Sequence, residues 1–235
     1  MGYIKDNIAE VEKKVAAACE RSGRKREDVL LLAVSKTIDV DRIKEAVDCG
    51  LISLGENKVQ EIMDKYDAMG PDIKWHLIGH LQTNKVKYII DKVEMIHSVE
   101  SLKLAEEISK RAAAKGVTAN ILLEVNVADE ETKFGIKIQE CEEMVRKISV
   151  LPNITIRGLM TVAPFVENPE ENRVYFRQLK QLLVDINSKK IDNVNMDVLS
   201  MGMTGDYEVA IEEGATIVRV GTGIFGARVY PEKKQ

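Results

Sequence analysis

The chain has 235 residues, of which 45% are hydrophobic, 31% are charged and only 5 are proline. This balance is typical of a folded globular protein of one or two domains, and it excludes a disordered, collagen-like or low-complexity chain. The 34 Lys and Arg residues face 38 Asp and Glu residues, a formal net charge of -4, with no long block of like charges. Neither nucleic acid nor an anionic membrane is indicated as a partner, so a small-molecule ligand is favoured.

The cysteines and the first residues bear on the cellular compartment. Cys19, Cys49 and Cys141 are odd in number and share no Cys-x-x-Cys spacing, which argues against a disulfide framework and against a structural zinc site. The N-terminus lacks the apolar core of a signal peptide, and no uncharged apolar stretch approaches the roughly 18 residues that a membrane span needs. We therefore expect a cytoplasmic protein.

Short apolar runs alternate with longer amphipathic segments along the chain. After an opening helix expected over residues 4–22, the runs cover residues 29–34, 51–54, 75–78, 95–99, 121–127, 156–161, 196–200 and 217–220. They are nearly continuous in Leu, Ile, Val and Met, as parallel strands covered on both faces are. Segments between them, such as 102–115 and 172–186, carry their apolar residues on one helical face.

Eight strand and helix units predict a closed (β/α)8 barrel of the TIM type with an N-terminal extra helix. We expect residues 1–235 to form this single domain, because no linker or second pattern divides the chain. In such a barrel the active site lies at the C-terminal ends of the strands. The residues that follow each apolar run are therefore the candidates for chemistry.

The last run is followed by the motif Gly-x-Gly-x-x-Gly over residues 221–226. A dinucleotide site is excluded, because too little chain follows for the helix, second strand and acidic residue of a Rossmann unit. Backbone N–H groups beside small residues can cradle an anion, and barrels often hold a phosphate with the loops after strands seven and eight. Ser200, Gly202, Gly221 and Thr222 form a candidate phosphate site, unless the glycines serve only tight turns.

Lys36 follows the first apolar run directly, at the expected mouth of the barrel. A lysine amine forms a Schiff base with an aldehyde when desolvation or nearby cations lower its pKa from about 10.4. Most lysines at strand ends are solvated, so the position alone is weak evidence, but together with a phosphate site it indicates a phosphorylated aldehyde.

The two histidines near the third run resemble a metal site only in their spacing. His76 and His80 flank a strand end and lack the acidic partner of a His-Glu-x-x-His motif, so no metal site is predicted. We interpret His76 as a buried, hydrogen-bonded strand residue that helps to line the pocket.

Several of these segments recur together in a known family. The segments AVSK at 33–36, GEN at 55–57, HLIGHLQTNK at 76–85, LSMGM at 199–203 and RVG at 219–221 closely resemble those of the pyridoxal phosphate homeostasis proteins. The resemblance covers essentially the whole chain, in order. It implies a barrel similar to the N-terminal domain of alanine racemase, carrying pyridoxal 5′-phosphate (PLP) as an internal aldimine.

The resemblance also implies roles for single residues. It makes Lys36 the Schiff-base lysine and directs Arg219 toward the pyridine nitrogen. Around the phosphate it places Ser200, Gly221 and Thr222, and along the ring it places Asn57, His76 and Met201. Lys85 is expected at the mouth of the barrel. The family's Ser-x-Asp after position 203 reads Thr-Gly-Asp here, which keeps the hydroxyl.

The expected chemistry favours binding over catalysis. PLP enzymes that stabilise a carbanion strongly pair the pyridine nitrogen with a carboxylate, and an arginine at that position leaves a weak electron sink. The related racemases take a second acid or base from an added β-domain, for which this chain has no residues left. We expect a PLP carrier that is not an enzyme, with PLP-dependent apo-enzymes as recipients.

Two alternatives stay open. One is an amino-acid racemase of the alanine racemase type, with Lys36 as one base. The other is a Schiff-base aldolase acting on a sugar phosphate, which would share the lysine and the phosphate site but need no bound cofactor.

Overall fold

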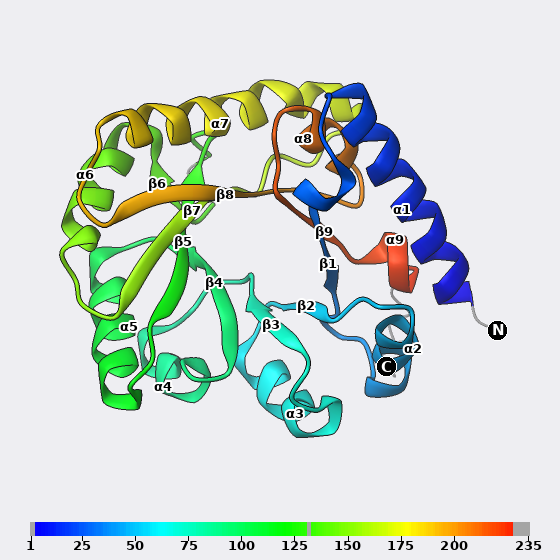
Figure 1. The fold of residues 1–235 in the computed structure, drawn as a ribbon, viewed down its shortest axis with the longest axis horizontal. Helices are drawn as coiled ribbons and strands as arrows, with labels where there is room; N and C mark the ends of the chain where they lie inside the picture. Colours follow the sequence, from blue (N-terminus) through cyan, green and yellow to red (C-terminus); the bar gives the residue numbers. More distant parts are fainter. Residues whose placement is uncertain (1–2, 131–132, 228–235) are drawn as a thin grey trace, which may run out of the picture.

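The computed structural model describes residues 3–130 and 133–227, and in these ranges eight parallel strands close into a barrel (Figure 1). The barrel strands are β1 (Leu30–Val34), β2 (Ser53–Glu56), β3 (Lys74–Leu77), β4 (Val93–Val99), β5 (Ala119–Asn126), β7 (Ile154–Met160), β8 (Val194–Met203) and β9 (Ile217–Val220). Neighbours pair in chain order, β4 pairs with β5, and β9 pairs back with β1. The predicted (β/α)8 barrel is confirmed.

Helices lie outside the strands and cover them. They are α1 (Tyr3–Arg21), α2 (Val40–Asp48), α3 (Val59–Met69), α4 (Val86–Ile89), α5 (Leu102–Lys115), α6 (Ile138–Ser149), α7 (Arg173–Ser188), α8 (Tyr207–Glu212) and α9 (Thr222–Phe225). The predicted N-terminal extra helix is α1, which packs along α8 and α9 (Figure 1). None of the helices in the described ranges is long and apolar enough to cross a membrane.

Local sequence explains why helix α5 begins and ends where it does. The side chain of Ser101 accepts a hydrogen bond from the backbone of Leu104 and caps the N-terminus. Gly116 takes a left-handed conformation, with φ of 67°, and ends the helix. Between these caps the apolar residues recur on one face, which packs on the barrel.

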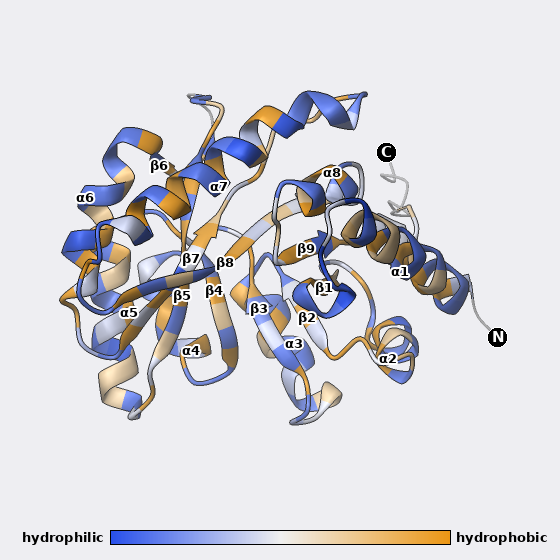
Figure 2. Ribbon diagram, turned by 45° about the horizontal axis from the view of Figure 1, so that its top comes forward, coloured by the Kyte–Doolittle hydropathy of each residue, from blue (hydrophilic) through white to orange (hydrophobic). Residues whose placement is uncertain are grey.

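Alternation along the strands divides the hydrophobic core into two layers. In β1, Leu31 and Ala33 pack outward beneath the helices, whereas Leu32 points into the barrel. The inner layer consists of Leu32, Met95, Leu122, Met160, Val198 and Ile217. Figure 2 shows the matching pattern on the helices, where hydrophilic and hydrophobic stretches alternate along α6 and α7.

Two features differ from the sequence prediction. A ninth strand, β6 (Ile136–Lys137), pairs with the end of β5 outside the barrel; at two residues it is too short to leave a periodic signal. Strand β8 extends beyond the predicted run at both ends, and its pairing with β9 shifts register between Ser200 and Met203. Such an irregularity redirects the side chains that follow it.

Candidate functional site

A cavity of about 550 Å³ opens at the C-terminal ends of several strands. Five of the predicted site residues line it, namely Lys36 after β1, Asn57 after β2, Arg219 in β9, and Gly221 and Thr222 after β9. These residues are distant in sequence, and closure of the barrel brings them together. The volume lies in the range of sites for small cofactors.

The other three predicted residues do not line this cavity. The side chain of Met201 is buried in the outer core, because Ser200 takes the inward position at that point of β8. The Ser200 hydroxyl is held inside the barrel by Arg219. His76 is also buried inside the barrel, as expected, where it forms a hydrogen bond with His97. It does not line the cavity.

A hydrogen-bonded chain of side chains crosses the barrel interior from Arg219. Its Nη1 donates to Oγ of Ser200 at 2.7 Å, and its Nη2 donates to the carbonyl oxygen of Thr161 at 2.8 Å. Ser200 Oγ lies 2.9 Å from Nδ1 of His97, and His97 Nε2 lies 2.9 Å from Nδ1 of His76. The chain therefore connects β9, β8, β4 and β3.

Arg219 fixes the direction of the first hydrogen bond only, because a guanidinium only donates and Ser200 Oγ therefore accepts. A hydroxyl has two lone pairs and one proton, so Ser200 can either donate to Nδ1 of His97 or accept from it. The tautomer of His97 then sets the direction of its hydrogen bond with Nδ1 of His76.

The electrostatics of the interior keep both rings neutral at neutral pH. Burial lowers the pKa of His76 to about 4, and Lys74 adds to the effect. Burial also lowers the pKa of His97 well below its usual value, with smaller effects from His76 and Arg219. Burial lowers the pKa of Arg219 to about 10, opposed by Asp206 and Glu124. At neutral pH the chain thus holds one cation and two neutral rings.

Hydrogen bonds connect the glycine-rich turn after β9 to the turn after β8. Thr204 Oγ1 accepts hydrogen bonds from the backbone N–H groups of Gly221 and Gly223, each at 3.3 Å. The hydroxyl that the sequence retains at this position therefore shapes the predicted phosphate end of the cavity. Gly202, also predicted there, lies within β8 with φ of +89° and close to α8, and it does not line this cavity.

Sequence reasoning missed a second polar group on the cavity wall. Asn172 is almost completely buried, and its Nδ2 donates to the carbonyl of Pro164 at 2.9 Å and to Oδ2 of Asp206 at 2.8 Å. Asp206 Oδ1 accepts the backbone N–H of Met203 at 2.7 Å. An asparagine ahead of a helix carries no signal of its own, and neither does His97 within an apolar strand.

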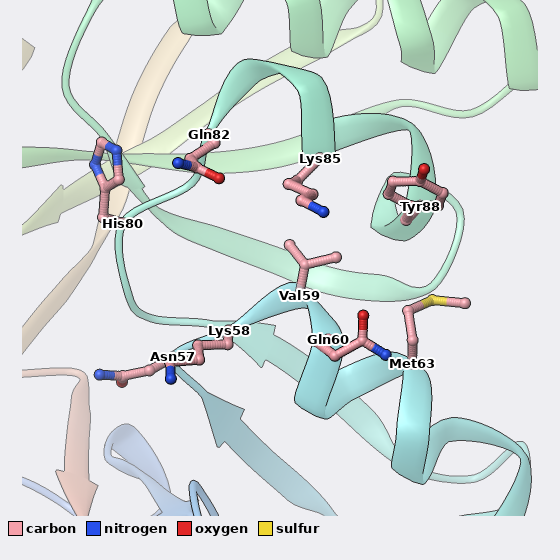
Figure 3. Close-up of a pocket in the computed structure, with 9 residues that line it drawn as sticks. All are labelled: Asn57, Lys58, Val59, Gln60, Met63, His80, Gln82, Lys85 and Tyr88. Carbon is pink, nitrogen blue, oxygen red and sulfur yellow. The ribbon is translucent and has the colours of Figure 1, made fainter.

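A second cavity of about 590 Å³ shares Asn57 with the first. Its lining residues, drawn in Figure 3, come from the segment that leads into α3, from the first turns of that helix, and from residues 80–88, which reach into α4: Asn57, Lys58, Val59, Gln60, Met63, His80, Gln82, Lys85 and Tyr88. Lys85, expected at the mouth, lies here and does not line the cavity of Lys36.

The residues of the first cavity fit a phosphorylated aldehyde. It combines a lysine amine at one strand end, a turn of small residues with the Thr222 hydroxyl after the last strand, and a buried guanidinium. An amine can bond a carbonyl carbon, and donors in a small-residue turn suit a phosphate. Residues 3–130 and 133–227 contain no cluster of three or more metal-ligating side chains.

The fold and the cavity define a barrel of the kind found in alanine racemase, and a sequence profile of the alanine racemase N-terminal domain matches residues 7–229. The pyridoxal phosphate homeostasis protein of Aquifex aeolicus is 47% identical over 96% of this chain and 98% of its own length. That of Escherichia coli K12 is 38% identical over 99% and 100%. The chain belongs to the pyridoxal phosphate homeostasis protein family.

Solved structures agree with this assignment. PipY of Synechococcus elongatus PCC7942, solved with PLP bound, superposes with a TM-score of 0.82 at 32% identity, covering 95% of this chain and 100% of its own. An alanine racemase of Clostridium difficile superposes with a TM-score of 0.70 at 17% identity, covering 97% of this chain and 58% of the racemase. The second likeness extends to the fold alone.

Proposed function

We propose that this protein binds PLP in the cavity of Lys36, holds it as a reversible Schiff base on that lysine, and acts as a carrier in PLP homeostasis. The observation that carries the proposal is the placement of Lys36, Gly221 and Thr222 on the walls of one cavity of about 550 Å³. The family and the PLP-bound relative support the choice of cofactor.

Each predicted site residue that lines the cavity has a role in this proposal. Lys36 supplies the amine, Gly221 and Thr222 bind the phosphate, and Asn57 lies along the ring. Arg219 faces the pyridine nitrogen. When bound, PLP supplies an electrophilic aldehyde and an electron-withdrawing ring. Because Arg219 stays protonated between Ser200 and Thr161, it cannot keep a proton on that nitrogen for the ring, and the electron-withdrawing effect stays weak.

The remaining titratable groups favour a carrier over a racemase. Among the described residues that line the cavity, Asp206 is the one carboxylate, and both of its oxygens already accept hydrogen bonds. A racemase needs a second acid or base opposite the lysine. The cavity offers no unengaged carboxylate for that task within the described ranges. In the proposed role PLP passes to PLP-dependent apo-enzymes in the cytoplasm.

The test is the visible spectrum of the purified protein with PLP, followed by borohydride reduction and peptide mapping. We expect a Schiff-base band and a reduced adduct on Lys36, both lost in Lys36→Ala and both kept in Lys85→Ala, which changes the lysine of the adjoining cavity. An adduct that persists in Lys36→Ala would refute the assignment.

The same samples separate the two alternatives. Turnover of one amino-acid enantiomer that disappears in Lys36→Ala would favour the racemase. A colourless protein that borohydride traps only in the presence of a sugar phosphate would favour the aldolase.

A further inference from the structure

The backbone on both sides of Lys36 is held by charged side chains of a single helix. The carbonyl oxygen of Ser35 accepts a hydrogen bond from Nζ of Lys65 at 2.9 Å. The N–H of Thr37 donates to Oε2 of Glu61 at 2.6 Å. Lys65 and Glu61 lie one turn apart on α3. This one helix therefore holds the backbone of the residue before Lys36 and of the residue after it by hydrogen bonds.

A third charged residue completes the cluster. Glu56 ends β2 and is fully buried, and its Oε1 accepts hydrogen bonds from Ser35 Oγ at 2.7 Å and from Lys65 Nζ at 2.8 Å. Lys65 Nζ also lies 3.5 Å from Oε2 of Glu61. Buried ion pairs add little stability over apolar residues of the same shape, but they can impose one arrangement. A role in geometry therefore explains the cluster better than a role in stability.

The backbone conformation of Thr37 is unfavourable and needs support from neighbouring residues. Thr37 has φ of +65°, a left-handed conformation that is unfavourable for a β-branched residue. The N–H of Ile38 donates to the carbonyl of Ser35 at 3.0 Å, so residues 35–38 form a tight turn with Lys36 at its second position. Glycine or asparagine would adopt such a turn readily, whereas threonine needs the hydrogen bond to Glu61.

We propose that Glu56, Glu61 and Lys65 are positioning residues, which hold the turn at 35–38 so that the amine of Lys36 enters the cavity in the orientation for bonding an aldehyde. This inference rests on the proposed function of Lys36. Formation of a covalent bond depends steeply on the alignment of the reacting atoms, and supporting residues commonly provide it. The three side chains act through the backbone and do not line the cavity themselves.

The test begins with Glu61→Gln, which keeps the shape of the side chain and removes the charge that holds Thr37. The Glu61 side chain is 21% exposed, so this variant is expected to fold. We expect the rate at which the PLP-free protein forms its covalent linkage, followed by absorbance after mixing with PLP, to fall about tenfold. Thermal unfolding of the PLP-free protein should stay close to that of the wild type.

A matched control lies on the same helix. Asp64 accepts a hydrogen bond from Gln60 at 2.7 Å on the exposed face of α3. Asp64→Asn therefore makes the same chemical change without touching the turn, and it should leave the rate of linkage unchanged. A tenfold loss in this control would assign the effect to the helix and overturn the proposal.

A rescue experiment separates positioning from general structural support. Glycine takes the left-handed conformation without steric cost and keeps the backbone N–H. Thr37→Gly combined with Glu61→Gln should therefore recover most of the lost rate. Failure of this rescue would overturn the role assigned to the turn.

The proposal and the function on which it rests fail in different ways. A covalent adduct that persists in Lys36→Ala would refute the assignment of the Schiff-base lysine. Loss of the adduct in Lys36→Ala, together with a wild-type rate in Glu61→Gln, would refute the positioning role alone.

Discussion

Arg219 donates a hydrogen bond to Oγ of Ser200 at 2.7 Å, and both side chains are buried in the barrel. The contact joins β8 to β9 just inside the proposed PLP cavity. Since Ser200 also bonds His97, a single hydroxyl links a permanent cation to two neutral imidazoles.

Ser200→Ala should destabilise the protein by about 2 kcal/mol, because it leaves Nη1 of Arg219 and Nδ1 of His97 buried without their partner. Urea unfolding of the PLP-free protein measures the change. Ser149→Ala, which removes an exposed hydroxyl bonded within α6, is the control and should cost less than about 0.5 kcal/mol. Equal stability of the two variants would contradict the assigned network.

The buried imidazoles give a spectroscopic prediction. Nitrogen NMR should find His76 and His97 neutral at pH 7, each with one protonated ring nitrogen, because burial lowers the pKa of both rings. His76 should remain neutral on acidification until about pH 4, because burial lowers its pKa to about 4. A doubly protonated ring at either position at neutral pH would contradict the buried network.

Gly202 in β8 and Gly205 in the turn after it should respond differently to alanine. A Cβ at Gly202 would lie 2.5 Å from Cβ of Ala210 and 2.9 Å from Cα of Tyr207, at φ of +89°. Gly202→Ala should therefore lower the free energy of unfolding by more than about 2 kcal/mol. A Cβ at Gly205 meets no described atom within 4 Å, so Gly205→Ala should be nearly neutral. Urea unfolding of both variants tests the contrast.

The carboxyl of Glu124 in β5 predicts a pH-dependent change in stability. Burial raises its pKa to about 7, Glu100 adds to the effect, and Arg219 opposes it. Above its unfolded pKa near 4.5, the folded protein still holds this proton, so folding takes it up. The contribution of Glu124 to stability therefore falls as the pH rises from about 4.5 to about 7 and is lost above that.

Glu124→Gln removes this dependence. Relative to the wild type, the variant should gain roughly 2 kcal/mol of stability between pH 5 and pH 8. Urea unfolding at the two pH values measures the gain. Glu94→Gln, which removes the same charge from an exposed side chain of β4, is the control. A constant difference between Glu124→Gln and wild type at both pH values would argue against a buried, protonated carboxyl.

The barrel could be predicted because each buried strand appears in the sequence as a short apolar run. A strand covered on both faces must be apolar at nearly every position, and the residues after such runs must lie at the strand ends. This reasoning located Lys36, Gly221 and Thr222 on the cavity that the structure contains, and the family resemblance added Asn57. It missed β6, because two residues carry no period.

Composition and pattern along the chain thus determined the fold class, the approximate ends of the strands and the positions of Lys36 and Gly221 at the cavity, since each depends on neighbours in sequence. Tertiary structure alone decided that Met201 points outward, that His97 connects Ser200 to His76, and that Asn172 meets Asp206. It also decided that side chains of α3 form hydrogen bonds with the backbone on both sides of Lys36. The reason is physical: such contacts join residues from different strands and helices, and only closure of the barrel sets the register and direction in which their side chains meet.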